Sequence, residues 1–590
     1  DEDDPDRVLA AAGRTAPATE TETGRLIARV VAALWAANDP LSTADRAELW
    51  SSAASDLEML AQQPGLARND FRKAAALLRT RAEAGDTPSA GRGPWRQVST
   101  RPEDLDFTPP VPARARRAAR VRLAALVAVL AVVVGSSVFV GLTLFSRCGE
   151  GVQERGGECV GVTDGSYVFD DQLADVQGKI LAENEKVAGQ RHVTVAVLTP
   201  LLPTEVGSVT PQRVRAQLEG AHVAQLAANE DRKEPKVRLL LANPGSRQQE
   251  LRQVVDQLVG LADEQRLVGV VGVGQSTTNA QLTARALAEA DIPMIASVIT
   301  ATGFQVEPGE PTGHIKGFAR VNSTTGNQIS VLADHLAGRG AGRSMLVYDD
   351  NEDDLYTSTL RREFKEAATS GKLSITVENP FDTEATLDNQ FNQITKDLCS
   401  DDALDTVLYA GRAVLLDDLV DNLRRRTCAL DRLITLVSGS DASMLRTRDD
   451  LRPRPGQPPL AVVYAPHVDP DAARQMGIAE FDRLAATFEE LGFDTADLAD
   501  GWGVMMHDAM LAMLDVINRA AVGLKAGEVP SRQSVRAQLS LSGRERNQVR
   551  GAGGPFTLDG TTGDAVGRRL PIIEVGPDGV FAVRAIVPVR

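Results

Sequence analysis

The stretch "LVGVVGVGQSTTNAQLTARALAEADIPMIASVI", Leu267 to Ile299, contains an apolar run, a polar turn, a helical segment and a second apolar run. Its beginning nearly matches the phosphate-binding loop G-x-x-x-x-G-K-[ST], with Gln275 in place of the lysine. The uncharged Gln275 cannot replace the lysine that reaches nucleotide phosphates. Residues 269–273 are also too apolar for a loop and are typical of a buried strand. The stretch therefore predicts a strand, a hydroxyl-bearing turn, a helix and a second strand, without a nucleotide site.

The same alternation continues along the chain from about residue 191. Near-continuous runs of Val, Ile and Leu, separated by helical segments, are typical of parallel strands covered on both faces. We therefore predict an α/β fold with doubly wound sheets, and a length of about 400 residues favours two sheets over one. The predicted strands begin near Val193, Val237, Leu267, Pro293, Ser344, Asp405, Leu433 and Leu460.

Several blocks follow this pattern in order: "VAVLTPLL", the stretch quoted above, "FARVNSTTGNQISVLADHLA", "SMLVYDDNEDDLYTSTLRREFKEA", "GWGVMMHDAMLAMLDVINRAA" and "VRGAGGPFTLDGTTGD". Together they resemble the type I periplasmic binding proteins, particularly the leucine/isoleucine/valine-binding branch, over roughly residues 191–587. The resemblance implies a two-lobed domain over residues 191–590. Lobe 1 would comprise residues 191–320 and 467–553, and lobe 2 residues 321–466 and 554–590. The implied function is closure of the lobes on an amino acid or a similar small polar solute.

Ser276 and Thr277 stand at the end of a predicted strand, just before a helix. In open α/β sheets, ligands bind beyond the carboxyl ends of the strands. The free N–H groups at a helix start favour an anion, so the carboxylate of a ligand fits there. We predict that both hydroxyls contact the ligand. The alternative is an N-cap role, for which Ser and Thr are also preferred.

The resemblance implies three further ligand-binding residues. Thr300 matches a threonine that contacts the amino-acid head group, Asp441 lies where an acidic residue accepts from the ligand's ammonium group, and Tyr356 resembles a pocket tyrosine. The alternatives are a loop threonine and, for Asp441, a helix N-cap. Arg412 stands where the family often has an aromatic residue. It would favour a ligand with a second anionic group, pair with Asp441, or remain solvated.

Residues Leu123 to Phe145 contain no charged side chain. At 1.5 Å per residue, a helix of this length crosses a bilayer core of about 30 Å. We predict a transmembrane helix over residues 121–145. A signal peptide is disfavoured because a long polar segment precedes it, and a lipoprotein anchor at Cys148 is disfavoured by the preceding Arg147. The basic N-terminal flank places the N-terminus in the cytoplasm and the C-terminal part outside the cell; it contains Arg114, Arg116, Arg117, Arg120 and Arg122.

The segments on either side of this predicted helix are assigned as follows. Residues 1–84 show amphipathic spacing and predict a small cytoplasmic helical domain. Residues 85–120 form a linker with a basic juxtamembrane stretch, and residues 146–190 an extracellular juxtamembrane segment.

All four cysteines lie on the predicted outer side, where disulfides persist. Cys148 with Cys159 and Cys399 with Cys428 is the most economical pairing, although four cysteines allow three connectivities. The close C-x-x-C pairs of a zinc site are absent from the sequence, and we predict neither a metal nor a cofactor.

Composition argues against two classes of function. A net charge of -16 and a pI near 5.1 argue against a nucleic-acid partner. The six histidines are dispersed, and the sequence contains neither H-E-x-x-H nor G-x-S-x-G, so we predict no enzyme and no catalytic residues.

Two hypotheses for the function remain open. A membrane-anchored receptor would deliver its solute to an ABC permease. A sensor would instead relay lobe closure through the single helix to the cytoplasmic domain and a signalling partner. Binding of a protein partner outside, or the loss of an ancestral ligand, are further alternatives.

Overall fold

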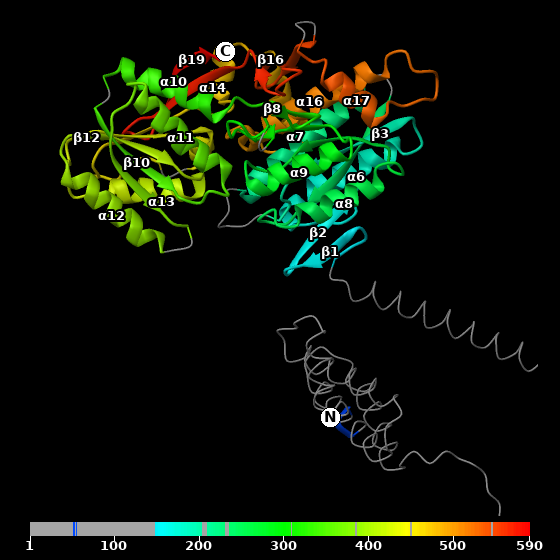
Figure 1. Ribbon diagram of the computed structural model, residues 1–590, viewed down its shortest axis with the longest axis horizontal. Coiled ribbons are helices and arrows are strands. Elements are labelled where there is room, and N and C mark those ends of the chain that lie inside the picture. The colour runs from blue at the N-terminus through cyan, green and yellow to red at the C-terminus, as the bar shows by residue number, and fades with distance from the viewer. Residues whose placement is uncertain are drawn as a thin grey trace, which may run out of the picture. The chain divides into compact units, whose positions relative to one another are not determined.

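The computed structural model describes residues 51–53, 55, 148–202, 209–230, 235–307, 310–340, 342–383, 386–448, 451–543 and 547–589 (Figure 1). The chain divides into two compact units, Asp1–Leu123 and Ala124–Arg590. In the first unit, residues 51–53 and 55 are helical. The predicted cytoplasmic domain otherwise lies outside the described residues, as do the linker and the transmembrane helix. Among the described residues, no helix is both long and apolar enough to cross a membrane.

Lobe 1 is built on a seven-stranded sheet in the order β1-β2-β4-β3-β5-β6-β9. The last five strands in this order are parallel, and β1 and β2 add an antiparallel edge. The strands are β1 Val152–Arg155, β2 Glu158–Thr163, β3 His192–Leu198, β4 Lys236–Asn243, β5 Leu267–Gly272, β6 Met294–Ala296 and β9 Phe318–Arg320.

Helices cover both faces of this sheet. Successive side chains of a strand point in opposite directions, so the nearly continuous apolar runs make both faces apolar. Val195 of β3 packs in the core with α6, α7 and α16, whereas Ala196 packs in the core with α8 and α9. The helical elements of lobe 1 are η1 Asp171–Leu173, α6 Ala174–Val187, α7 Pro211–Glu230, α8 Leu251–Leu261, α9 Thr278–Glu289, α14 Pro470–Gln475, α15 Ala479–Leu491, η3 Thr495–Leu498, α16 Trp502–Ala521 and α17 Arg532–Leu539.

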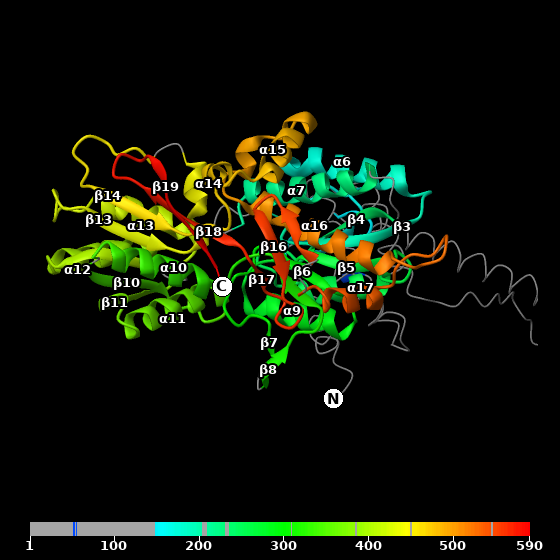
Figure 2. The ribbon, with the colours of Figure 1, turned by 90° about the horizontal axis from the view of Figure 1, so that it is seen from above.

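Lobe 2 repeats this arrangement, with a sheet in the order β11-β10-β12-β13-β14-β18-β19. Val407 of β12 packs with α12 and α13, and Leu408 packs with α10 and α11 on the opposite face. The strands are β10 Arg343–Asp349, β11 Ile375–Phe381, β12 Leu404–Ala410, β13 Ile434–Ser438, β14 Leu460–Tyr464, β18 Arg569–Val575 and β19 Phe581–Pro588. The helical elements are α10 Thr325–Gly338, α11 Leu355–Thr369, α12 Leu387–Ser400, α13 Ala413–Arg424 and η2 Ser440–Thr447. Figure 2 shows the two sheets as separate lobes.

The predicted two-lobed α/β fold is confirmed, and each of the eight predicted strands is present. Two boundaries differ from the prediction. Residues 152–187 belong to lobe 1, because β2 pairs with β4 and α6 packs in the core, rather than forming a juxtamembrane segment. Residues 554–566 also belong to lobe 1, since Phe556 and Leu558 pack in its core. They form part of a three-stranded sheet made by β15 Val549–Gly551, β16 Gly554–Leu558 and β17 Ala565–Val566. A separate two-stranded sheet is made by β7 Val306–Glu307 and β8 Glu310–His314.

Buried arginines anchor two of the three segments that cross between the lobes. Arg568 donates to Asp508 on α16 at 2.9 Å and to the carbonyl oxygen of Val321 at 2.8 Å. Arg320 donates to Asp564 at 2.6 Å. Asp508 is fully buried and also accepts from two backbone N–H groups after β15. These contacts tie the crossing segments to lobe 1 at the hinge.

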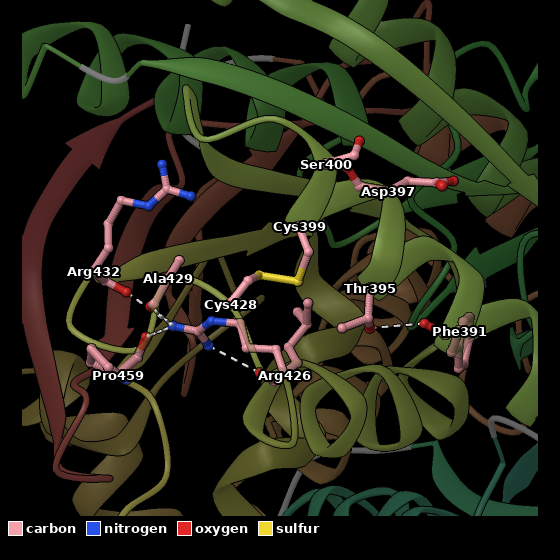
Figure 3. The surroundings of a disulfide bond; sticks show 11 residues. Phe391, Thr395, Asp397, Cys399, Ser400, Arg426, Cys428, Ala429, Arg432 and Pro459 are labelled. Carbon is pink, nitrogen blue, oxygen red and sulfur yellow. Dashed lines mark hydrogen bonds between the residues drawn. A yellow bond between two sulfur atoms is a disulfide. The ribbon is translucent and has the colours of Figure 1, made fainter.

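The two predicted disulfides, Cys148–Cys159 and Cys399–Cys428, are present. The second joins the end of α12 to the segment after α13 (Figure 3). Beside it, the guanidinium of Arg426 donates to backbone carbonyl oxygens around the end of α13, including those of Leu423 and Pro459. Arg426 therefore holds together the loop that carries Cys428.

Candidate functional site

The predicted ligand-binding residues meet where the carboxyl ends of the strands of the two lobes face each other. Ser276 lies in lobe 1, and its carbonyl oxygen accepts from the backbone N–H of Tyr356 in lobe 2 at 3.2 Å. Arg412 stacks over the Tyr356 ring, 4.8 Å from its centroid. The hydroxyl of Tyr356 accepts from the backbone N–H of Asp441 at 3.1 Å. Residues that are distant in the sequence thus form one site between the lobes.

In lobe 1, the side-chain hydroxyls of Ser276 and Thr277, in the turn after β5, accept hydrogen bonds from nearby backbone N–H groups. The Ser276 hydroxyl accepts from the backbone N–H groups of Thr300 and Ala301, at 2.9 Å and 3.2 Å. The Thr277 hydroxyl accepts from the N–H of Ala280 and is the N-cap of α9. The predicted N-cap alternative therefore holds for Thr277. At Thr300, the backbone N–H group binds Ser276, and the side chain is buried.

The start of α9, predicted to bind an anion, makes a contact with the other lobe. The backbone N–H of Thr278 donates to the carbonyl oxygen of Asp353 at 3.0 Å. Gly274, with a φ of +75°, allows the turn to approach Gln248, whose side chain accepts from the N–H of Gln275 at 3.2 Å. A Cβ atom at position 274 would collide with that side chain. The backbone N–H groups of Gln275 and Thr278 therefore already have hydrogen-bond partners within the protein.

In lobe 2, Asp441 occupies the centre of the site at the beginning of η2. One carboxylate oxygen accepts from the backbone N–H of Ala413 at 3.0 Å, and the other forms a 2.6 Å ion pair with Arg213 of lobe 1. Burial raises the pKa of the Asp441 carboxyl, but Arg213, Arg412 and the Ala413 hydrogen bond lower it overall. Asp441 is thus ionised and already engaged by a cation.

Arg213 is the central residue that the sequence did not single out. It lies in the first turn of α7, it is only 1% exposed, and its Nε is 2.6 Å from Oδ2 of Asp500. Its guanidinium stacks on the ring of Trp502, 4.4 Å from the centroid, and also donates to the carbonyl oxygen of Asp441. Burial lowers the pKa of Arg213, and the two carboxylates raise it overall. Its partners are 228 and 287 residues away in the sequence, so the residues next to Arg213 in the chain did not reveal it.

Arg412 does not pair directly with Asp441, which corrects one of the predicted alternatives. Its Nε and Nη2 instead bind the two carboxylate oxygens of Asp354, at 2.7 Å and 2.9 Å. Nη2 also lies 3.5 Å from the carbonyl oxygen of Ser276 across the lobe boundary. Although burial lowers the pKa of Arg412, Asp354 and Asp441 raise it overall. Asp354 also caps α11, so the acidic turn after β10 holds this arginine in place.

Buried polar atoms on three side chains of this region have no hydrogen-bond partner among the described residues: Trp502 stacks on Arg213, His467 interacts electrostatically with Arg213 and Asp441, and Ser443 follows Asp441 by two residues. They are Nδ1 of His467, Nε1 of Trp502 and Oγ of Ser443. Each of these residues is at most 7% exposed. Because an unpartnered buried polar group is unfavourable, each of these atoms is available for a hydrogen bond with a solute or a water molecule.

His467 predicts a pH dependence of stability. Burial lowers its pKa to about 3, Arg213 and Arg568 lower it as well, and Asp441 raises it. Between about pH 6 and pH 4 the unfolded chain therefore binds a proton that the native chain does not. We expect this group to reduce the free energy of unfolding by about 1.4 kcal/mol per pH unit as the pH falls. Urea unfolding of wild type and His467→Gln from pH 7 to pH 4 tests this; identical slopes would contradict it.

In the described part of the chain, no group of three or more His, Cys, Asp or Glu side chains could hold a metal ion. The charged groups between the lobes are arranged as ion pairs, Arg213 with Asp441 and Asp500, and Arg412 with Asp354. The arrangement is suited to recognising charged groups of a ligand.

Comparison with solved structures identifies the class of fold. A leucine-binding protein, LivK, from Thermotoga maritima MSB8 matches with a TM-score of 0.51 and 18% identity, over 67% of this chain and 99% of that protein. A solute-binding protein of an ABC transporter from Rhodopseudomonas palustris HaA2, in complex with p-hydroxybenzoic acid, matches with a TM-score of 0.50 and 14% identity, over 68% of this chain and 96% of that protein. The chain therefore contains the fold of type I periplasmic binding proteins.

These structural neighbours are binding proteins by their descriptions. No family model and no curated protein sequence matches the chain.

Proposed function

We propose that residues 148–590 form an extracellular receptor that closes its two lobes on a small polar solute. The observation that carries this proposal is the meeting of buried charged residues from both lobes in one site, at the ion pair between Arg213 and Asp441. Ligands of two-lobed α/β proteins bind beyond the carboxyl ends of the strands, where these residues lie. Closure is coupled to binding when the ligand contacts both lobes in the closed state.

Amino acids and other small carboxylates are the ligand class to test first. Leucine and p-hydroxybenzoic acid, which are named for two of the structural neighbours, both carry a carboxyl group. The site between the lobes contains two arginines that can bind a carboxylate and several buried carboxylates that can bind an ammonium group. Ser276, Thr277, Thr300 and Tyr356 would then shape the site around Arg412 and Asp441.

The ligand class is tested by a thermal-shift screen. The purified full-length chain, in detergent, is screened against the twenty L-amino acids and p-hydroxybenzoate. A compound present at about 100 times its dissociation constant should stabilise the native state by roughly 2.7 kcal/mol, a readily measured shift. If no compound in this panel shifts the transition, the proposed ligand class is wrong.

The receptor would be anchored by the helix predicted over residues 121–145, with the N-terminus in the cytoplasm. The two disulfides fit an oxidising compartment. Protease added to intact cells should then remove the C-terminal domain and leave an N-terminal fragment with the cells. If the protease removes neither the C-terminal domain nor the N-terminal fragment, or removes both, the proposed orientation is wrong.

Delivery of the solute to an ABC permease is the first proposed role. Sensing is the second, and it is favoured by the predicted cytoplasmic helices within residues 1–84. Crosslinking in cells followed by purification of the full-length chain separates the two roles. Recovery of a permease supports uptake, whereas recovery of a cytoplasmic signalling protein supports sensing.

A further inference from the structure

A cavity of about 380 Å³ lies in lobe 2, where α12 and α13 end. One wall is the last part of α12, and the other is the segment from Asn422 to Thr427 at the end of α13. The disulfide Cys399–Cys428 joins these two walls (Figure 3). Both helices lead to the amino ends of the strands that follow them, β12 and β13, whereas the candidate site lies at the carboxyl ends of the strands. The cavity is therefore separate from the site between the lobes.

The lining of this cavity contains three cations and, among the described residues, no carboxylate. The cations are Lys396, Arg425 and Arg426, and the other lining residues are one cysteine, two asparagines and three residues with hydroxyl groups. The whole chain has a net charge of -16, so a lining with three cations and no acid runs against the balance of the chain. Cationic nitrogen atoms, amides and hydroxyls are donors that suit an anion with several oxygen atoms.

The side chains of Lys396 and Arg425 are exposed, and neither forms an ion pair with another described residue. The acid that Arg425 influences, Asp418, does not line the cavity. Burial raises the pKa of the Asp418 carboxyl, and Arg425 lowers it only in part. Both cationic groups can therefore turn to an anion in the cavity without breaking an existing ion pair.

Arg426 is a buried cation, only 3% exposed, and no carboxylate of the described residues pairs with it. Its guanidinium donates to the carbonyl oxygens of Leu423 at 3.0 Å and Pro459 at 2.8 Å, while Nε has no partner among the described residues. Burial and the nearby Arg432 lower its pKa to about 10. A buried guanidinium without a counter-ion is unfavourable, and an anion held beside it would supply the missing charge.

We propose that this cavity binds a phosphate group, either as the free ion or as a phosphate ester. A phosphate group carries a charge of about -1.5 to -2 at pH 7 and three strong acceptor oxygens, so it matches several cationic donors better than a single carboxylate does. The volume of the cavity lies in the range of small-molecule pockets, which leaves room for the organic part of an ester. This binding is independent of the receptor function proposed for the site between the lobes.

Isothermal titration calorimetry on the full-length chain in a non-ionic detergent tests the proposal with two probes, inorganic phosphate and glycerol 3-phosphate. We expect wild type to bind at least one probe, and the Lys396→Gln/Arg425→Gln variant to bind it at least about 10-fold more weakly. Both positions are exposed, so the variant should fold, which circular dichroism checks. Tighter binding of glycerol 3-phosphate identifies an ester as the ligand, whereas equal or tighter binding of inorganic phosphate identifies the free ion.

Arg452 and Lys525 offer a matched control, because both are exposed, form no ion pair with another described residue and do not line the cavity. The Arg452→Gln/Lys525→Gln variant loses the same charge and should bind the probe within about 2-fold of wild type. Equal affinity of the two double variants, or no binding of either probe to wild type, would overturn the inference. The cations would then only be partners of the helix ends, where positive charge is favoured without a ligand. Neither result bears on solute binding between the lobes.

Discussion

Replacing Arg213 by alanine is expected to lower the free energy of unfolding by about 3–5 kcal/mol. The change leaves the carboxylates of Asp441 and Asp500, each at most 5% exposed, without the cation that compensates their burial. It also removes the contact with the ring of Trp502. Urea unfolding at pH 7 measures the difference between the variant and wild type.

The pH dependence of the Arg213→Ala variant provides an independent check. Without the guanidinium, burial should raise the pKa of the Asp441 carboxyl above the unfolded value. The destabilisation is then fully present at neutral pH and shrinks as the pH falls, because the native state takes up a proton first. Arg252→Ala serves as the control, since Arg252 and Asp256 form an exposed pair worth about 0–0.5 kcal/mol. A loss below about 1 kcal/mol for Arg213→Ala would contradict the central role of this ion pair.

Replacing Cys399 and Cys428 together by serine is expected to lower the free energy of unfolding by about 3–4 kcal/mol. The bridge spans 29 residues, and opening it restores conformational freedom to the unfolded chain. The bridge joins the end of α12 to the segment after α13, two helices that cover one face of the lobe 2 sheet. Urea unfolding of wild type and the double variant under oxidising conditions gives the size of the effect.

A reductant separates the disulfide from other effects of the serine substitutions. It should destabilise wild type by more than it destabilises the Cys399→Ser/Cys428→Ser variant, which retains the Cys148–Cys159 bridge. Equal stability of wild type and the variant would show that the loop is already ordered in the unfolded chain or that the native bridge is strained.

The strand pattern and the class of fold could be predicted because they depend on local apolar periodicity. Runs such as "VTVAVL" in β3 and "VLYA" in β12 are nearly continuous, since both faces of each sheet are covered. By contrast, the short polar strand β1, with the sequence "VQER", lacks this signal. It forms because β2 provides its backbone partners. Because its local apolar signal is weak, the sequence alone places the first part of lobe 1 outside the domain.

The place of Ser276 and Thr277 at the end of a strand could likewise be predicted from local sequence, whereas Thr300, Tyr356 and Asp441 were expected in the site from the family resemblance alone. Ser276, Thr277, Thr300, Arg412 and Asp441 follow strands, and the fold brings the carboxyl ends of those strands together. What could not be predicted is how the side chains are paired. Arg412 binds Asp354 rather than Asp441, and Arg213 binds Asp441 and Asp500.

The sequence by itself determined the parallel α/β architecture, the two-lobed resemblance and the strand ends that contribute to the site. Only the tertiary structure decided that Arg213 meets Asp441 and Asp500. The physical reason is that strand and helix patterns arise from neighbours a few residues apart, whereas an ion pair depends on which side chains the complete fold buries together. Arg213 resembles any polar residue of a helix until residues more than 200 positions away enclose it.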